Sequence, residues 1–318
     1  MIRVGYLSEA TFGEQAARAH FASRENVVYS SAGKTHKEVI DAVLKGKFDN
    51  VAIPIRNKLV PEIDGIYETL IAHVMNNRIN IKAEVKIVGE EFVKVEQCLI
   101  APAGVKLEDI RTVHSKKEAL AQCGKFIAEH KLSTVEEEST AAGVYDILKN
   151  NLRDTAVIGN RLIAVKNPGM VILASNIQDL KDNYTHFIIL GNQMPDKTGK
   201  DKTAIMLYLP NEPHVLANIL GIFSAADVNI DLKTVPIKRT LNESLFIVYV
   251  NGKNSHIKDK VLSDAINVAS EISEKLWIIG SYPEAIINDI SSVRRGQQTR
   301  KIHTRMQPSM MPLRKHTA

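Results

Sequence analysis

The chain opens with MIRVGYLSEATFGEQAARAHF, residues 1–21, and this stretch decides the fold. Residues 2–7 predict a short strand that ends at a turn, and the small-residue face of 11–21 predicts a helix after it. The same order continues with a strand at 27–30, a helix at 36–46, a strand at 50–55 that Pro54 breaks, and a helix that starts near Asp64. Because strands alternating with helices form parallel sheets covered on both faces, an α/β fold with a largely parallel sheet is expected.

From residue 79 onward the pattern indicates a second lobe. Longer strands are expected at 81–88 and 93–101, helices at 114–130 and 139–150, and short strands at 156–158, 171–174 and 183–190. Ser139 or Thr140 is expected to cap the helix at 139–150. Two α/β lobes joined by crossing strands form a cleft, and clefts between lobes are where small ligands bind.

The segment 191–202, GNQMPDKTGKDK, is polar and carries turn-forming residues, which predicts a linker. Beyond it we expect a strand at 203–209, a helix at 214–226, strands at 230–237 and 244–250, a helix at 258–272 and a strand at 276–281. This βαββαβ order is that of the split ferredoxin-like unit. The predicted parts are a two-lobed domain at 1–190, a linker at 191–202, a terminal domain at 203–284 and a basic, disordered tail at 285–318.

The composition of the 318 residues excludes several classes of protein. Hydrophobic residues make up 44%, so the chain can bury cores and is not a disordered chain. Much of the net charge of +5 sits in the tail, where 294–315 hold seven basic and no acidic side chains, so no nucleic-acid partner is expected. The start of the chain lacks the apolar run of a signal peptide, and no stretch is long enough for a membrane span. We therefore expect a cytoplasmic protein with no membrane partner.

The two cysteines, Cys98 and Cys123, have neither metal-ligand nor redox spacing. The ten histidines are scattered, with no His-x-x-x-His or Cys/His grouping. We expect two free thiols, no metal and no cofactor.

Five short motifs resemble those of the prephenate dehydratase family. They are residues 5–17 with a Thr-Phe pair, 52–57 in place of a Val-Pro-Ile-Glu-Asn-Ser segment, 114–123, 139–142, and 183–187 at a Thr-Arg-Phe signature. The terminal unit resembles the ACT domain of these enzymes at 216–230 and 280–283. The resemblance covers about 1–285. It implies a two-lobed, periplasmic-binding-protein-like catalytic region followed by a ferredoxin-like ACT domain.

The resemblance implies a lyase that converts prephenate, a dicarboxylate, to phenylpyruvate in phenylalanine biosynthesis. Loss of CO2 and hydroxide makes the ring aromatic, and hydroxide leaves well only when a donor hydrogen-bonds to it or protonates it. By the resemblance, the catalytic residue is Thr185, which acts as an oriented donor. The substrate-binding residues that it implies are Thr11, Phe12, Arg56, Asn57, Lys58, His114, Ser115, Ser139, Thr140, Asn183, His186 and Phe187. Of these, His114 and Ser115 are expected at the start of a helix that lines the cleft.

Three residues depart from the family's motifs: Arg56 replaces Glu, Lys58 replaces Ser and His186 replaces Arg. Arg56 and Lys58 add positive charge near the expected cleft, where a guanidinium can hold a carboxylate bidentately. The alternative is that both side chains point to solvent. Related enzymes decarboxylate prephenate without aromatising it and in general lose the signature threonine, so Thr185 favours the dehydratase. The alternatives are such a decarboxylase and a non-catalytic amino-acid-sensing protein.

The resemblance also implies an ACT domain that binds phenylalanine at a dimer interface, so a homodimer or homotetramer is expected. Both effector motifs are changed. A Gly-Ala-Leu turn appears as His214, Val215 and Leu216, and a Glu-Ser-Arg-Pro segment appears as Lys-Thr-Val-Pro, with Thr234 and Pro236. Since glycine lets the backbone approach a ligand closely, His214 is expected to obstruct the amino acid. We expect little or no binding of phenylalanine.

Overall fold

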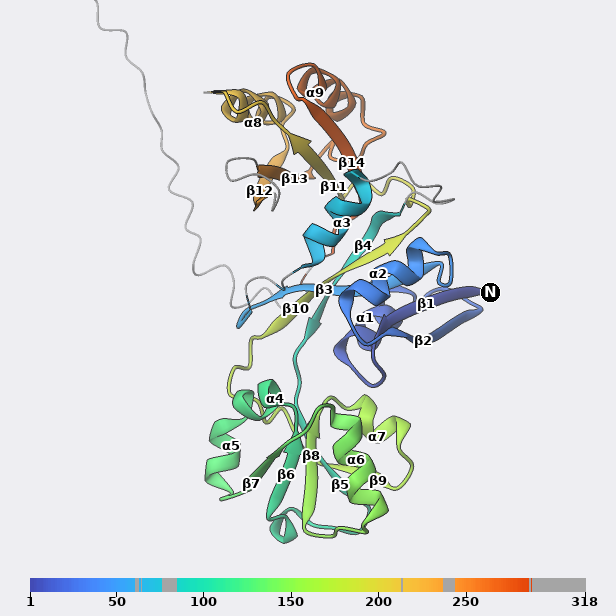
Figure 1. Cartoon of the computed structure of the whole chain (residues 1–318), viewed down its shortest axis with the longest axis vertical. Helices are drawn as coiled ribbons and strands as arrows, with labels where there is room; N and C mark the ends of the chain where they lie inside the picture. The colour runs from blue at the N-terminus through green and yellow to red at the C-terminus, as the bar shows by residue number, and fades with distance from the viewer. Residues whose placement is uncertain are drawn as a thin grey trace, which may run out of the picture. The chain divides into compact units, whose positions relative to one another are not determined.

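The computed structural model describes residues 1–60, 63, 65–75, 85–212, 214–236, 244–285 and 287. We describe the chain in three parts, a first lobe, a second lobe at 98–178, and a C-terminal unit at 201–285 (Figure 1), of which the second lobe has a sheet of its own. The elements of the first lobe are β1 (Ile2–Leu7), α1 (Phe12–His20), β2 (Val27–Gly33), α2 (His36–Leu44), β3 (Asn50–Asn57), α3 (Ile66–Met75), β4 (Lys86–Lys94) and β10 (Tyr184–Gly191). The predicted β-α-β-α-β-α start is confirmed.

Helices cover both faces of the first lobe's sheet, as predicted (Figure 1). The apolar face of α1 packs on Phe187 and Ile189 of β10, while α2 and α3 pack on the opposite face with Ile188 and Leu190. The expectation of a largely parallel sheet is confirmed for β1, β2 and β3, which pair in parallel. The exception is β10, which pairs antiparallel with both β3 and β4. The difference arises because β10 returns from the second lobe rather than from a crossover helix.

Pro54 does not end its strand, since β3 continues to Asn57. The pairing of β3 with β1 stops at Ala52, so Pro54 lies beyond that ladder. On its other side Pro54 lies next to a register shift in the pairing with β10, between His186 and Phe187. A proline, which has no N–H, is tolerated at such positions.

The strand β4 differs from the two strands expected at 81–88 and 93–101, of which residues 81–84 lie outside the described residues. It runs through Gly89, Glu90 and Glu91, a stretch whose polarity does not suggest a strand. Two of these residues, Gly89 and Glu91, contact His20 of α1. The Glu91 carboxylate accepts a hydrogen bond from His20 Nδ1 at 3.0 Å, and a Cβ at Gly89 would stand 2.2 Å from the His20 ring. Glycine therefore permits the close approach of α1.

The second lobe contains a five-stranded sheet, in the order β7-β6-β8-β5-β9, among the described residues. Its elements are β5 (Cys98–Pro102), a 3-10 turn (Leu107–Asp109), β6 (Thr112–Ser115), α4 (Lys117–Gln122), α5 (Gly124–Glu129), β7 (Ser133–Glu136), α6 (Thr140–Lys149), β8 (Thr155–Gly159), α7 (Leu162–Lys166) and β9 (Met170–Ser175).

The prediction of one helix over 114–130 is wrong. His114 and Ser115 end β6, where they are buried between β7 and β8, and the helical pattern begins only after Lys116. The helix is also divided at Cys123, which ends α4 and precedes α5. The second helix, α6, is confirmed: the Ser139 hydroxyl accepts the Ala142 N–H at 3.1 Å.

The C-terminal unit has the predicted βαββαβ order. Its elements are β11 (Asp201–Tyr208), α8 (Val215–Ala225), β12 (Asn229–Pro236), β13 (Ser244–Gly252), α9 (Lys260–Glu271) and β14 (Lys275–Pro283). Both helices pack on one face of its sheet. Residues 213 and 237–243, and the predicted tail apart from 285 and 287, lie outside the described residues.

The sheets of the first lobe and the C-terminal unit are continuous. In the described part of the chain they form one nine-stranded sheet, ordered β12-β13-β11-β14-β4-β10-β3-β1-β2. The junction is parallel, with Gly280 of β14 opposite Ile87 of β4. A Cβ at Gly280 would lie 2.3 Å from the Ile87 carbonyl oxygen, so the strands meet where only glycine fits. Tyr67 of α3 and Tyr249 of β13 also join their hydroxyls at 3.1 Å.

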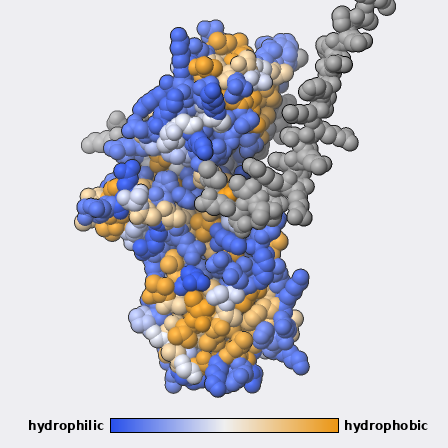
Figure 2. Space-filling model, turned by 180° about the vertical axis from the view of Figure 1, so that it is seen from behind, coloured by the Kyte–Doolittle hydropathy of each residue, from blue (hydrophilic) through white to orange (hydrophobic). Residues whose placement is uncertain are grey.

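Apolar residues gather in two areas of the face in Figure 2, over the second lobe and over part of the C-terminal unit. Exposed apolar side chains of the C-terminal unit include Val261 and Val268 of α9 and Ile272 just after it. None of the helices in the described ranges has the length and apolar character needed to cross a membrane.

Candidate active site

The loop between β1 and α1 is strained and tightly held. Ser8 and Ala10 have φ of 56° and 53°, in the left-handed region that residues with a Cβ rarely adopt. The Thr11 hydroxyl donates to the Leu7 carbonyl at 2.9 Å, and the Glu14 carboxylate accepts the Ala10 N–H at 3.0 Å. Strain of this kind persists only where surrounding contacts enforce it, and it clusters at ligand-binding sites.

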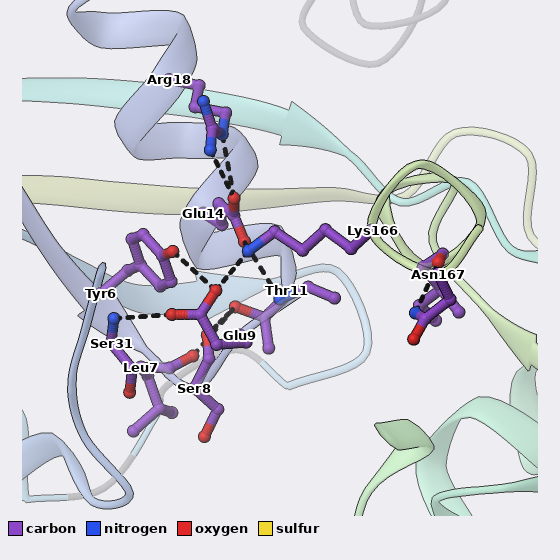
Figure 3. A network of polar contacts seen from close by, with 12 residues as sticks. Tyr6, Leu7, Ser8, Glu9, Thr11, Glu14, Arg18, Ser31, Lys166 and Asn167 are labelled. Carbon is purple, nitrogen blue, oxygen red and sulfur yellow. Dashed lines mark hydrogen bonds and ion pairs between the residues drawn. The ribbon is translucent and has the colours of Figure 1, made fainter. Parts of the chain in front are cut away.

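A charged network holds this loop to the second lobe (Figure 3). Lys166, at the end of α7, forms ion pairs with Glu9 and, at 2.6 Å, with Glu14. Glu14 is fully buried and also pairs with Arg18 at 2.9 Å. Glu9 in turn accepts the Tyr6 hydroxyl at 3.0 Å. One ammonium group therefore joins two carboxylates that flank the strained loop.

The same contacts set the charge states of the network. Burial alone would lower the pKa of Lys166, but the hydrogen bonds from its ammonium to Glu14 and Glu9 outweigh burial and raise it. Burial would raise the pKa of Glu9, but Lys166 and Tyr6 outweigh it and lower it. Burial, then the bond to Glu9, raises the pKa of Tyr6. Lys166 and Glu9 are thus charged at neutral pH.

Asn160 makes a second connection from the second lobe to the loop. Its side-chain amide donates to the Ala10 carbonyl at 2.6 Å, while its side-chain oxygen accepts the Leu162 N–H at 2.8 Å. Since Glu14 binds the Ala10 N–H, both polar groups of the Ala10 backbone are held. The strained loop is fixed from both lobes.

A pocket of about 240 Å³ lies where this loop meets the second lobe. Its lining comes from the loop and the start of α1, from the segment that leads out of β4, from α4, and from the ends of β8 and α6: Ala10, Thr11, Phe12, Val95, Gln97, Lys116, Glu118, Ala119, Gln122, Thr140, Gly159, Asn160 and Ile163. The first residues of α1 and α6, Phe12 and Thr140, both line it. Helix N-termini attract anions, and of the two charged side chains in the lining Lys116 is positive and Glu118 is negative.

A second pocket of about 310 Å³ shares Glu118 and Gln122 with the first. It is also lined by Asn183, whose buried side-chain oxygen accepts the Lys58 N–H at 3.3 Å. The two pockets therefore adjoin along α4.

Thr185 lies on the α1 side of the first lobe's sheet. It is buried and stands opposite Asn57 of β3 and Val93 of β4, two residues before the pocket residue Val95. Phe187 points to the same side and packs against α1. Thr185 is not among the residues that line the pocket.

His186 points to the opposite face of the sheet from Thr185. Its Nε2 donates to Glu90 at 2.9 Å, its ring stacks on Phe92 at 4.2 Å, and its Nδ1 has no partner among the described residues. Burial lowers the pKa of His186, and the bond to Glu90, which raises it, does not compensate. For Glu90, burial would raise the pKa, but His186 and Lys202 outweigh it and lower it.

The structure therefore brings together only some of the residues that the sequence predicts. Thr11, Phe12 and Thr140 line the first pocket and Asn183 lines the second, while Ser139 is the helix cap. Arg56 and Lys58 are exposed, and Asn57 accepts the Leu59 and Val60 N–H groups.

His114 and Ser115 line neither pocket. The His114 ring lies 3.0 Å from Glu137, and the Ser115 hydroxyl donates to the Ile158 carbonyl at 2.6 Å. Both side chains are occupied within the core of the second lobe.

The predicted effector residues lie in the C-terminal unit. His214 is exposed and has a φ of 67°, so it keeps a conformation that glycine adopts without strain. Val215 is buried in the helix core, Leu216 packs against that core, and Thr234 is exposed. Pro236 ends β12, and its side chain lies outside the described part of the structure.

Sequence reasoning missed Glu9, Glu14, Lys116, Asn160 and Lys166. Glu9 and Glu14 lie inside the motif at 5–17, and two acids in a segment of small residues are a usable signal. Lys166 has none, because it is 157 residues from Glu9 and belongs to no motif. Among the described residues, no three His, Cys, Asp or Glu side chains are grouped as metal ligands would be.

Comparisons with known proteins agree with this architecture. A family model described as prephenate dehydratase matches residues 4–195. The chain is 29% identical to arogenate dehydratase/prephenate dehydratase 2 of Arabidopsis thaliana, over 89% of this chain and 73% of the relative. The structure of prephenate dehydratase from Arthrobacter aurescens in complex with L-Phe has a TM-score of 0.72 at 28% identity, over 89% of this chain and 90% of that one.

A second solved structure, GqqA, described as a novel type of quorum quenching acylase, has a TM-score of 0.75 at 25% identity. It covers 90% of this chain and 98% of its own. The family match runs from β1 to just past β10 and spans more than half of the sequence. The chain therefore belongs to the prephenate dehydratase family.

Proposed function

We propose that the chain is a prephenate dehydratase, a lyase that converts prephenate to phenylpyruvate for phenylalanine biosynthesis. The observation that carries the proposal is the pocket at the junction of the lobes, where the first residues of α1 and α6 and the side chain of Lys116 meet. Prephenate carries two carboxylates, and each helix N-terminus offers N–H groups and a positive dipole end to one of them.

The step needs little covalent help from the protein. The ring carboxylate leaves as CO2, its electrons enter the ring, and the C–O bond to the hydroxyl breaks as the ring becomes aromatic. The departing hydroxide takes up a proton and ends as water. We assign Thr185 as the oriented donor to that oxygen, since a hydroxyl is too weak an acid to protonate it freely. Its place opposite Val93, two residues before the pocket residue Val95, supports this assignment.

The three departures from the family motifs fit different roles. Arg56 and Lys58 are exposed, and no described contact directs either side chain into the pockets. His186 is bound to Glu90 on the far face of the sheet, which favours an indirect role. We therefore expect the altered residues to leave the anion-binding pocket intact.

The test incubates the purified protein with prephenate and follows the enolate absorbance of phenylpyruvate in alkali. Consumption of prephenate without that band would indicate a decarboxylase that does not aromatise, and no consumption would indicate a binding protein. Arogenate is assayed in parallel because the Arabidopsis relative carries both names. The variant Lys116→Met should raise KM about tenfold, as expected for a lost charged hydrogen bond. Lys149→Met, an exposed lysine at the end of α6, is its control.

For the C-terminal unit we propose an ACT-like role in assembly and regulation. Its βαββαβ order and the exposed apolar side chains Val261 and Val268 on α9 support a dimer formed through this unit. Light scattering of the full chain tests the assembly. Calorimetry with phenylalanine tests the effector, and micromolar binding would contradict our expectation for His214.

A further inference from the structure

A single buried carboxylate, that of Glu90 in β4, joins the first lobe to the C-terminal unit. It is 2% exposed as a residue and accepts four hydrogen bonds. Lys202 Nζ reaches both oxygens, at 2.7 and 2.9 Å, His186 Nε2 donates at 2.9 Å, and the Ala285 backbone N–H donates at 3.1 Å. All four lone-pair sites of the carboxylate are used.

These partners come from both ends of the C-terminal unit. Lys202 belongs to β11, the first strand of that unit, and Ala285 follows β14, its last strand. His186 belongs to β10 of the first lobe. Glu90, in β4, thus binds residues at the start and at the end of the C-terminal unit and one residue of β10 in the first lobe.

The strand that Glu90 holds is the one that carries Thr185. His186 is the next residue, and its ring is fixed on one side by Phe92 and at Nε2 by Glu90. Because neighbouring residues of a strand point to opposite faces, a shift of His186 moves the backbone that aims the Thr185 hydroxyl. A displacement of about 1 Å at a reacting group can cost on the order of a hundredfold in rate.

The C-terminal unit is needed to satisfy this carboxylate. Lys202 is the only lysine or arginine that the described residues place on Glu90, and its side chain is 14% exposed. A buried carboxylate that loses one partner is strongly destabilised, so its remaining partners must shift or water must enter. His186 would take part in that rearrangement.

We propose that Glu90 is a positioning residue for the dehydration, which holds β10 through His186 and makes the placement of Thr185 depend on Lys202 of the C-terminal unit. The catalytic part of this inference rests on the proposed function. The structural part of the inference, a coupling between Lys202 and β10, is independent of the proposed function.

The experiment uses the full chain and the variants Lys202→Met, Lys202→Arg and Lys197→Met. Lys197→Met is the matched control, because it removes an ion pair with Asp259 inside the C-terminal region and leaves Glu90 alone. Lys202→Met should lower kcat about tenfold or more and change KM less than about threefold, since the anion pocket is untouched. Lys202→Arg should restore most of kcat, and Lys197→Met should match the wild type.

Hydrogen exchange of the amides at 185–188 gives a readout that needs no turnover. Protection there should fall in Lys202→Met and stay at the wild-type level in Lys197→Met. If Lys202→Met does not fold, His186→Leu and His186→Gln carry the same test. The Gln amide can replace the Nε2 donor and should rescue kcat, whereas Leu should not.

Wild-type kcat and wild-type protection in Lys202→Met, or equal kcat in His186→Leu and His186→Gln, would overturn the inference. A wild type that turns over neither prephenate nor arogenate, with protection still lost in Lys202→Met, would overturn the proposed function and support the coupling. The two failures are thus distinguishable.

Discussion

Replacing Lys166 by Met tests whether the contact between the lobes shapes the pocket. The pair with Glu9 contributes at most about 1 kcal/mol, since the Glu9 side chain is 50% exposed. The pair with Glu14 contributes more, about 2 kcal/mol, because Glu14 is fully buried. It is not larger, since Arg18 and the Ala10 N–H remain bound to Glu14. The variant should therefore lose about 2 to 3 kcal/mol of contact between the lobes.

This free energy favours the arrangement in which the loop at 8–11 and the second lobe enclose the substrate. A loss of about 2 kcal/mol changes that equilibrium roughly 30-fold. We expect KM for prephenate to rise by about 10- to 30-fold in Lys166→Met, with a smaller change in kcat, because Thr185 is not part of the network. Initial-rate measurements over a range of prephenate concentrations give both constants.

Lys149→Met is the control, since it removes a lysine from the surface of the same lobe. It should leave both constants unchanged. A KM in Lys166→Met within about twofold of the wild type would refute the argument, because a contribution of even 1 kcal/mol would raise KM about fivefold.

Thr185→Val, which keeps the shape of the side chain but removes the hydroxyl, should lower kcat about 10²- to 10³-fold. Thr185→Ser should retain most of kcat. Wild-type turnover in Thr185→Val would contradict the assigned role. Ser139→Ala should lower the free energy of unfolding by about 1 kcal/mol in urea titrations, because the Ala142 N–H loses its cap; an unchanged midpoint would mean that the cap is not needed. Acid should destabilise the fold through His186, whose pKa burial lowers below that of the unfolded chain. The unfolded state therefore binds the proton first as pH falls, so stability is lost from about pH 7 downward. Thermal unfolding of His186→Gln should depend less steeply on pH between about 7 and 5 than that of the wild type, and parallel curves would argue against this sign.

The order of elements could be predicted wherever local pattern and tertiary structure agree. The alternation over residues 2–75 is visible because each helix has one apolar face and each strand is short and apolar. Both ends of β4 are predicted as strand, but its middle, residues 89–92, is not, because Glu90 and Glu91 find their partners on β10, β11 and α1, which the local sequence does not show. The last two residues of β6, His114 and Ser115, are predicted as helix because the helical pattern of α4 follows them at once.

The candidate site was predictable only in part, for similar reasons. Thr11, Phe12 and Thr140 lie at helix starts, which the sequence marks with caps and small residues, and all three line the pocket. His186 was placed with Thr185 because the two are adjacent, although the alternation of a strand sends them to opposite faces. Lys166 contributes through a contact that only the folded chain creates.

The junction of β14 with β4 limits how freely the parts of this chain can be exchanged. The polar segment between β10 and β11 looks like a site for cutting or for grafting another regulatory module. A chain cut there would leave β4 as an edge strand with unpaired N–H and C=O groups, a template for aggregation. A grafted module would need a residue as small as Gly280 opposite Ile87, since any Cβ meets the carbonyl oxygen there. The linker in the sequence therefore does not mark a point at which the C-terminal unit can be exchanged freely. The residues of β14 and β4 that face each other at the junction are constrained to change together.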